Sequence, residues 1–119
     1  MKNVLLLAAV SEGATGLALL VMPSLVGRLL LGAELTGVAV PVAGVLGIAL
    51  IALSVACWPG CTPLCGMLTY SAAVTLYLAY VGFAGGLTGI LLWPAVVVHA
   101  ILTFFLNRAR LKDQHEGAE

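Results

Sequence analysis

The sequence predicts an all-α integral membrane protein: a bundle of four transmembrane helices with a short interfacial helix between the first and second spans. Two observations carry this prediction. Hydrophobic residues make up 62% of the chain and charged residues only 8%, and residues 35–107 contain no Asp, Glu, Lys or Arg. A water-soluble domain needs a charged, solvated face, so lipid is the expected environment of this stretch.

The length of the chain predicts a single membrane domain, residues 1–119. Each crossing of a bilayer takes about 20 residues, so four crossings leave room only for short connections and a tail. The expected spans, by residue number, are 3–22, 38–58, 66–86 and 90–107.

The connections follow from proline, glycine and charge. Pro23 ends the first span, and residues 23–32 are too short to cross; Arg28 among leucines there predicts a helix lying in the membrane interface. Two prolines and a glycine predict the turn at residues 59–65, and a glycine-rich stretch predicts another at residues 85–89. Residues 108–119 form the expected polar tail.

The positive charges predict an orientation. Lys2 lies at one terminus, and Arg108, Arg110 and Lys112 lie at the other. Four spans place both termini on the same side, and the positive-inside rule makes that side cytoplasmic. We therefore expect a multi-pass protein of a bacterial-type inner membrane, with the cysteine-bearing turn also facing the cytoplasm.

Small residues at helical spacing predict close helix packing. Ala39, Ala43 and Gly47 recur every fourth residue in the second span, and Ala9 and Gly13 have the same spacing in the first. No hydrophobic force pairs helices in lipid, so small residues that let backbones approach promote pairing. We expect packing within the bundle; the alternative is a face for a second copy or a partner subunit.

Glu12 is the most informative polar residue. It falls near the middle of the first span, where a carboxyl group costs a few kcal/mol unless it is protonated, paired or hydrated. His99 falls at a similar depth in the fourth span, and the first and last spans of a four-helix bundle can be neighbours. A Glu12–His99 hydrogen bond is therefore expected, with a satisfied buried imidazole as the simpler interpretation of His99.

Three further polar residues extend the candidate binding or proton site: Thr15 beside Glu12, Tyr77 near the middle of the third span, and Thr103 one turn after His99. Together they predict a hydrated path or ligand pocket between helices. The alternative is that hydroxyls bond to the backbone of their own helix, which we favour for the serines and threonines.

Cys57, Cys61 and Cys65 are spaced by four residues around the turn at 59–65. Three thiolates can hold a soft metal ion such as Cu(I) or Zn(II). Pro59 and Pro63 interrupt the helix that would align them, and small apolar fillers near an interface are the favoured interpretation. No cofactor is expected beyond this candidate metal.

Two resemblances add to these expectations. A single carboxylate, Glu12, in the first of four spans of a short chain is similar to the small multidrug resistance transporters. That resemblance implies a dimer whose carboxylate binds protons and cationic drugs in turn, although residues 11–16 depart from the family's flanking order. Residues 23–32, the apolar run from Gly47 and the terminal Trp58 resemble small four-span, loosely DoxX-like bacterial proteins, which implies an inner-membrane helical bundle.

The sequence favours a non-enzymatic protein. No phosphate-binding glycine loop or His-Glu-x-x-His run is visible, and the few basic residues do not predict nucleic-acid binding. We expect a ligand-binding bundle or an accessory subunit of a membrane complex, with the lipid bilayer and a second copy or larger complex as partners. The alternatives are proton-coupled transport through Glu12 and metal or redox chemistry at the cysteines.

Overall fold

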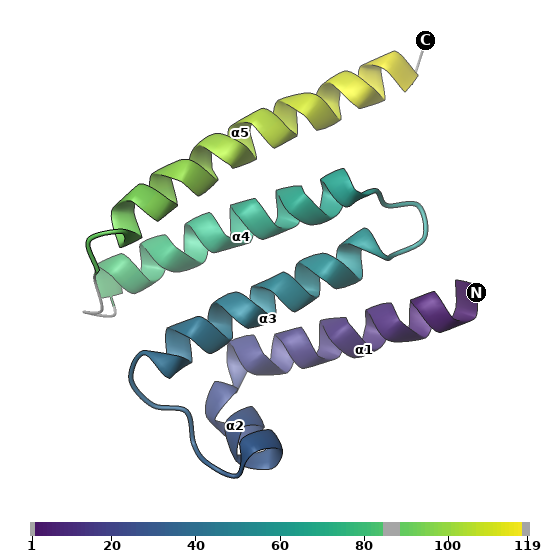
Figure 1. The fold of residues 1–119 in the computed structure, drawn as a ribbon. Helices are drawn as coiled ribbons and strands as arrows, with labels where there is room; N and C mark the ends of the chain where they lie inside the picture. Colours follow the sequence, from purple (N-terminus) through teal and green to yellow (C-terminus); the bar gives the residue numbers. More distant parts are fainter. Residues whose placement is uncertain (1, 85–88, 118–119) are drawn as a thin grey trace.

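The computed structural model describes residues 2–84 and 89–117, and these residues form five α-helices (Figure 1). The helices, in chain order, are α1 (Lys2–Val21), α2 (Pro23–Leu31), α3 (Ala39–Ala56), α4 (Pro63–Ala84) and α5 (Leu92–Gly117). The predicted all-α class is confirmed.

Four of these helices are long and apolar enough to cross a membrane. The qualifying segments are Asn3–Val21, Ala39–Ala56, Pro63–Ala84 and Leu92–Gly117. They correspond to the four predicted spans, and α2 lies between the first and second of them, where a short helix is expected. Pro23 is the first residue of α2, and Gly32, with a φ of 78°, caps its other end.

The four long helices lie side by side in the order α1, α3, α4, α5 (Figure 1). The molecule measures 53 × 37 × 15 Å, and its smallest dimension is little more than the 10–12 Å diameter of one helix. The helices therefore form a single layer. The expectation that the first and last spans are neighbours is wrong for the described residues, since α1 packs against α2 and α3 while α5 packs only against α4.

Small side chains fill the centre of this layer. Ala9 of α1, Ala43 and Ala52 of α3, and Val74 of α4 are all buried, whereas α5 buries no residue. Such small residues allow the helix axes to approach closely without large interdigitating side chains. The resulting core runs through α1, α3 and α4, and α5 forms an outer edge.

Two helix boundaries differ from the sequence prediction by three or more residues. Helix α4 begins at Pro63 rather than residue 66, because proline suits the first helical position as well as a turn. Helix α5 continues through Gly117, because the tail contains good helix formers and no proline. The predicted turn at 85–89 falls mainly on residues 85–88, which lie outside the described residues.

Candidate functional site

Glu12 lies midway along α1 and is half-buried. No described side chain forms an ion pair or hydrogen bond with it. The next residue, Gly13, faces α3, because a Cβ atom built there would lie 2.9 Å from Oγ of Ser54. Glu12 therefore occupies the border of the α1–α3 contact without a partner of opposite charge.

His99 lies on the side of α5 that faces α4. Its Nδ1 lies 2.8 Å from the carbonyl oxygen of Ala95. Because a carbonyl can only accept, Nδ1 is the donor of this hydrogen bond. The ring of Tyr70 on α4 meets the imidazole edge-on, with 6.0 Å between centroids.

The two candidate threonines bond to their own helices. Thr15 Oγ1 donates to the carbonyl of Ser11 at 2.9 Å, and Thr103 Oγ1 donates to the carbonyl of His99 at 2.7 Å. The sequence favoured such bonds, from a hydroxyl to the backbone of its own helix, for the serines and threonines. Because both hydroxyl hydrogens are used in this way, neither threonine has a donor free for a polar path between helices. In contrast, the ring and hydroxyl of Tyr77 lie against Gly44 of α3, where any Cβ atom would overlap them.

Four of the five candidate residues fall on opposite sides of the layer, and Tyr77 lies between them, on α4 against α3. Glu12 and Thr15 belong to α1, whereas His99 and Thr103 belong to α5, and these two helices are separated by α3 and α4. The expected Glu12–His99 hydrogen bond does not form within the described chain. Matching depth along the helices did not make the two residues neighbours, because the helices form a layer.

An apolar groove of about 320 Å³ lies between α1, α2 and α3, within the usual size range of ligand pockets. We call it the α1–α2–α3 groove. Leu19 of α1, Leu30 of α2 and Ala39 of α3 contribute to its walls, as does Leu35 of the segment after α2. All of its lining residues are apolar, so the groove suits an alkyl or other hydrocarbon group.

Glu12 shares a helix face with the wall of this groove. Glu12 and Leu19 are seven residues apart on α1, and residues at that spacing lie on the same side of a helix. The rise of an α-helix places their backbones about 10 Å apart. A molecule lying along this side of α1 passes from hydrocarbon surroundings to a carboxyl group.

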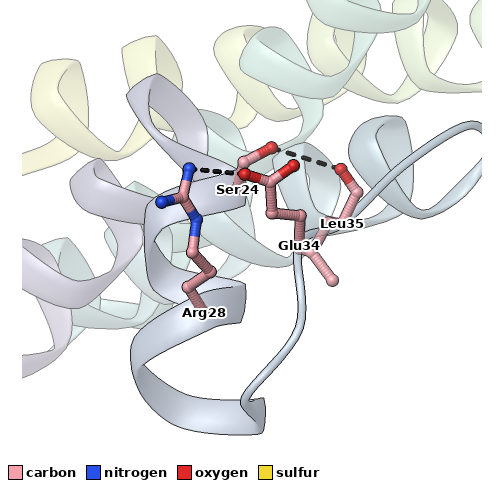
Figure 2. Close-up of polar contacts among 4 residues, drawn as sticks. All are labelled: Ser24, Arg28, Glu34 and Leu35. Atoms are coloured by element: carbon pink, nitrogen blue, oxygen red, sulfur yellow. Dashed lines mark hydrogen bonds and ion pairs between the residues drawn. The ribbon is translucent and has the colours of Figure 1, made fainter.

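Polar contacts hold the segment after α2 against that helix (Figure 2). The guanidinium of Arg28 pairs with the carboxylate of Glu34 at 2.5 Å, and Ser24 Oγ donates to the carbonyl of Leu35 at 3.2 Å. Gly27 is buried beneath the same segment, and a Cβ atom there would lie 2.8 Å from Cγ of Leu35. These contacts place Leu35 in the wall of the groove.

Sequence reasoning missed this arrangement, although one signal pointed to it. Arg28 and Glu34 are the only charged residues between residues 13 and 107, and they have opposite signs. Two such residues within one turn-forming stretch of an apolar chain favour each other as partners.

Another apolar groove, of about 350 Å³, lies between α3 and α4. Its walls include Ala52, Ala56, Gly66 and Met67. All of its lining residues belong to these two helices. The α1–α2–α3 groove, in contrast, is lined by three helices and the segment after α2.

The three cysteines lie at or near the turn between α3 and α4, and all are half-buried. Among the described residues, no group of three or more His, Cys, Asp and Glu side chains lies close enough to hold a metal ion. Cys57 caps the end of α3, Cys61 lies in the turn, and Thr62 Oγ1 donates to Cys65 Sγ at 3.9 Å. Partial burial, and after it the neighbouring Cys65, raises the pKa of the Cys61 thiol above its usual value, and the positive charge of Arg110 opposes that rise.

Comparison with known proteins gave no match: no family model, no curated protein and no solved structure is similar to this chain. Function must therefore be inferred from the geometry of the chain itself.

Proposed function

We propose that the chain crosses a bacterial-type inner membrane four times, with both termini in the cytoplasm. The four long apolar helices support this arrangement. Helix α1 begins and α5 ends at the same end of the layer (Figure 1), and Arg108, Arg110 and Lys112 lie near the end of α5. Positive residues of this kind favour the cytoplasmic side.

Within that membrane, the protein acts as a non-enzymatic binding protein for an amphipathic molecule. The observation that carries this proposal is the α1–α2–α3 groove, whose walls come from three helices and a folded segment and are entirely apolar. An apolar tail lies in the groove beside Leu19 and Leu30. The Arg28–Glu34 pair and the Ser24–Leu35 hydrogen bond hold one wall in place.

Selectivity comes from the polar end of the ligand. Lipid tails are as apolar as the groove, so a hydrocarbon gains only packing contacts on entering it from a bilayer. Glu12 is half-buried, lies on the same face of α1 as Leu19 and has no partner among the described residues. It provides a carboxyl group for a cationic or hydrogen-bond-donating head. The preferred ligand is therefore a long-chain amine or ammonium compound.

A binding titration in nanodiscs tests this function. The probe is a fluorescent long-chain alkylammonium compound, with its uncharged alcohol analogue as reference and empty nanodiscs as background. The unaltered chain should prefer the ammonium probe. Glu12→Gln should weaken its binding about tenfold, or about 1.4 kcal/mol, to the level of the alcohol.

A groove-filling variant distinguishes the contribution of the ligand's apolar tail to binding from that of its polar head. Ala39 lines the groove, so Ala39→Trp should reduce the binding of both probes. Ala100 is exposed on α5, remote from the groove, so Ala100→Trp is the matched control and should bind like the unaltered chain. Equal binding by the Ala39→Trp and Ala100→Trp variants would exclude the groove as the binding site.

Proton-coupled transport is the second candidate, favoured by the lack of any described partner for Glu12. A carboxyl group that exchanges a proton for a cation must be free to release both. Proteoliposomes carrying a pH gradient should then take up the ammonium probe, and Glu12→Gln should abolish the uptake. Uptake that persists in this variant excludes transport through Glu12. Because His99 lies on the opposite edge of the layer, His99→Gln should have little effect.

A further inference from the structure

Ser54 of α3 contacts α1 at Gly13, the residue that follows Glu12. A Cβ atom built on Gly13 would lie 2.9 Å from Oγ and 3.4 Å from Cβ of Ser54. Consecutive Cα atoms of a chain are about 3.8 Å apart. Ser54 and Glu12 therefore lie at the same level of the α1–α3 contact.

The register of the two helices also aligns Glu12 with Ser54. Helices α1 and α3 run in opposite directions (Figure 1), and Leu19 Cβ lies 3.2 Å from the position of a Cβ atom built on Gly47. Glu12 precedes Leu19 by seven residues. Ser54 follows Gly47 by seven residues. Seven residues lead back to the same side of a helix after about 10 Å, and both steps run the same way along the layer, so the alignment recurs at Glu12 and Ser54.

The hydroxyl of Ser54 forms no hydrogen bond within the described part of the chain. In contrast, Thr15, Thr75 and Thr103 each donate to the carbonyl four residues earlier in their own helices. Ser54 is half-buried, as Glu12 is. A hydroxyl oxygen can accept hydrogen bonds, and so can an ionised carboxylate. Two acceptor groups are therefore available to a ligand at this level of the α1–α3 contact.

The helices that carry these two groups contain no aromatic side chain. Phe, Tyr and Trp are absent from α1, α2 and α3, and Trp58, the first aromatic residue of the chain, lies beyond the end of α3. Proteins that recognise a quaternary ammonium group surround it with aromatic rings. A primary ammonium group instead has three N–H donors, as lysine does, and these suit oxygen acceptors.

We propose that Glu12 and Ser54 together bind the head group of the ligand and select a protonated primary amine over a quaternary ammonium compound. This inference rests on the proposed function, because it concerns the polar end of the same ligand. The ammonium group donates one hydrogen bond to the Glu12 carboxylate and another to Ser54 Oγ, and the alkyl tail runs along α1 to the groove beside Leu19. A trimethylammonium group carries the same charge but has no N–H to donate.

The test compares two fluorescent probes with the same long alkyl tail, one with a primary amine head and one with a trimethylammonium head. Both heads are positively charged at neutral pH, and empty nanodiscs give the background partition of each probe into lipid. The unaltered chain in nanodiscs should prefer the primary amine probe. Ser54→Ala should weaken the binding of that probe about threefold to tenfold, the effect of one hydrogen bond. The same variant should bind the trimethylammonium probe as the unaltered chain does.

Ser71→Ala is the matched control. Ser71 is a buried serine of α4 whose hydroxyl also has no partner in the described structure, and among the described residues α4 does not pack against α1. This variant should bind both probes as the unaltered chain does. Equal binding of the two probes by the unaltered chain, or equal weakening of both by Ser54→Ala, would overturn the head-group assignment. The proposed function would still stand in that case if Glu12→Gln weakens both probes, whereas binding of neither probe by the unaltered chain would overturn both proposals.

Discussion

Gly16 and Gly47 bring the backbones of α1 and α3 into contact. A Cβ atom built on either glycine would lie 2.5 Å from the carbonyl oxygen of the other. The two carbonyl oxygens belong to the backbones of α1 and α3, so they cannot move aside by rotation as a side chain can. The absence of a side chain at both positions is what allows α1 and α3 to pack as they do.

Gly16→Ala should therefore destabilise the protein, although alanine favours helix by up to about 1 kcal/mol over glycine. Forcing a methyl group into this contact costs about 1–3 kcal/mol, so the net effect should be destabilising. The measurement is equilibrium unfolding of the full chain in mixed micelles. A Cβ atom at Gly89 meets nothing within 4 Å, so Gly89→Ala is the control. Equal midpoints for the two variants would contradict this packing.

At the scale of elements, α2 and the segment after it, which we call the flap, contribute to the wall of the groove. Two polar contacts, Arg28–Glu34 and Ser24–Leu35, hold the flap together (Figure 2). The side chains of Arg28 and Glu34 are 61% and 52% exposed, so their ion pair contributes little to stability in water, about 0–1 kcal/mol. Gly27 contributes more, because it allows Ala33 and Leu35 to pack directly onto the helix.

These magnitudes predict an order of effects. Arg28→Gln should change the free energy of unfolding by less than about 1 kcal/mol. In contrast, Gly27→Leu should displace the flap, cost about 1–3 kcal/mol and weaken ammonium-probe binding as Ala39→Trp does. Unfolding and probe titration of both variants check the order. A larger loss of binding in Arg28→Gln than in Gly27→Leu would show that the ion pair, not the packing, holds the flap.

The elements were predictable because their signals are local. Proline at residue 23 and glycine at residue 32 delimit α2 in sequence and in structure. Pro63 was read as part of a turn and instead begins α4, since proline suits either place. The charges after residue 107 led to the prediction that the fourth span ends there. Charged residues do not end a helix, however, and α5 continues through Gly117.

At the scale of the whole molecule, the order of the helices was not predictable. Hydrophobic residues are spread around all sides of α3 and α4, so periodicity does not say which neighbours these helices take. Equal depth for Glu12 and His99 is consistent with many arrangements, and only the single layer separates them. Each candidate binding residue could thus be named from the sequence. The groove on the Glu12 side of α1 could not be predicted, because it depends on the tertiary arrangement.

The layer also explains why we propose ligand binding on one side of the molecule and not on the other. Helix α5 buries no residue, and Val97, Ile101 and Phe105 on its surface are each at least half exposed. A bilayer or a partner protein is needed to cover such a surface. The other edge, where α1 and α3 meet α2, instead encloses a groove with a carboxyl group on the same side of α1.

The most direct test of the proposed function is photolabelling of the nanodisc-embedded chain with a diazirine-bearing alkylammonium compound. Peptide mapping should place the adducts on Leu19, Leu30 and Leu35, and excess unlabelled ammonium compound should remove them. The exposed residues Val97, Ile101 and Phe105 should be labelled only at the level set by lipid contact, without competition. Labelling of α5 as strong as that of the groove, or groove labelling that resists competition, would contradict the account.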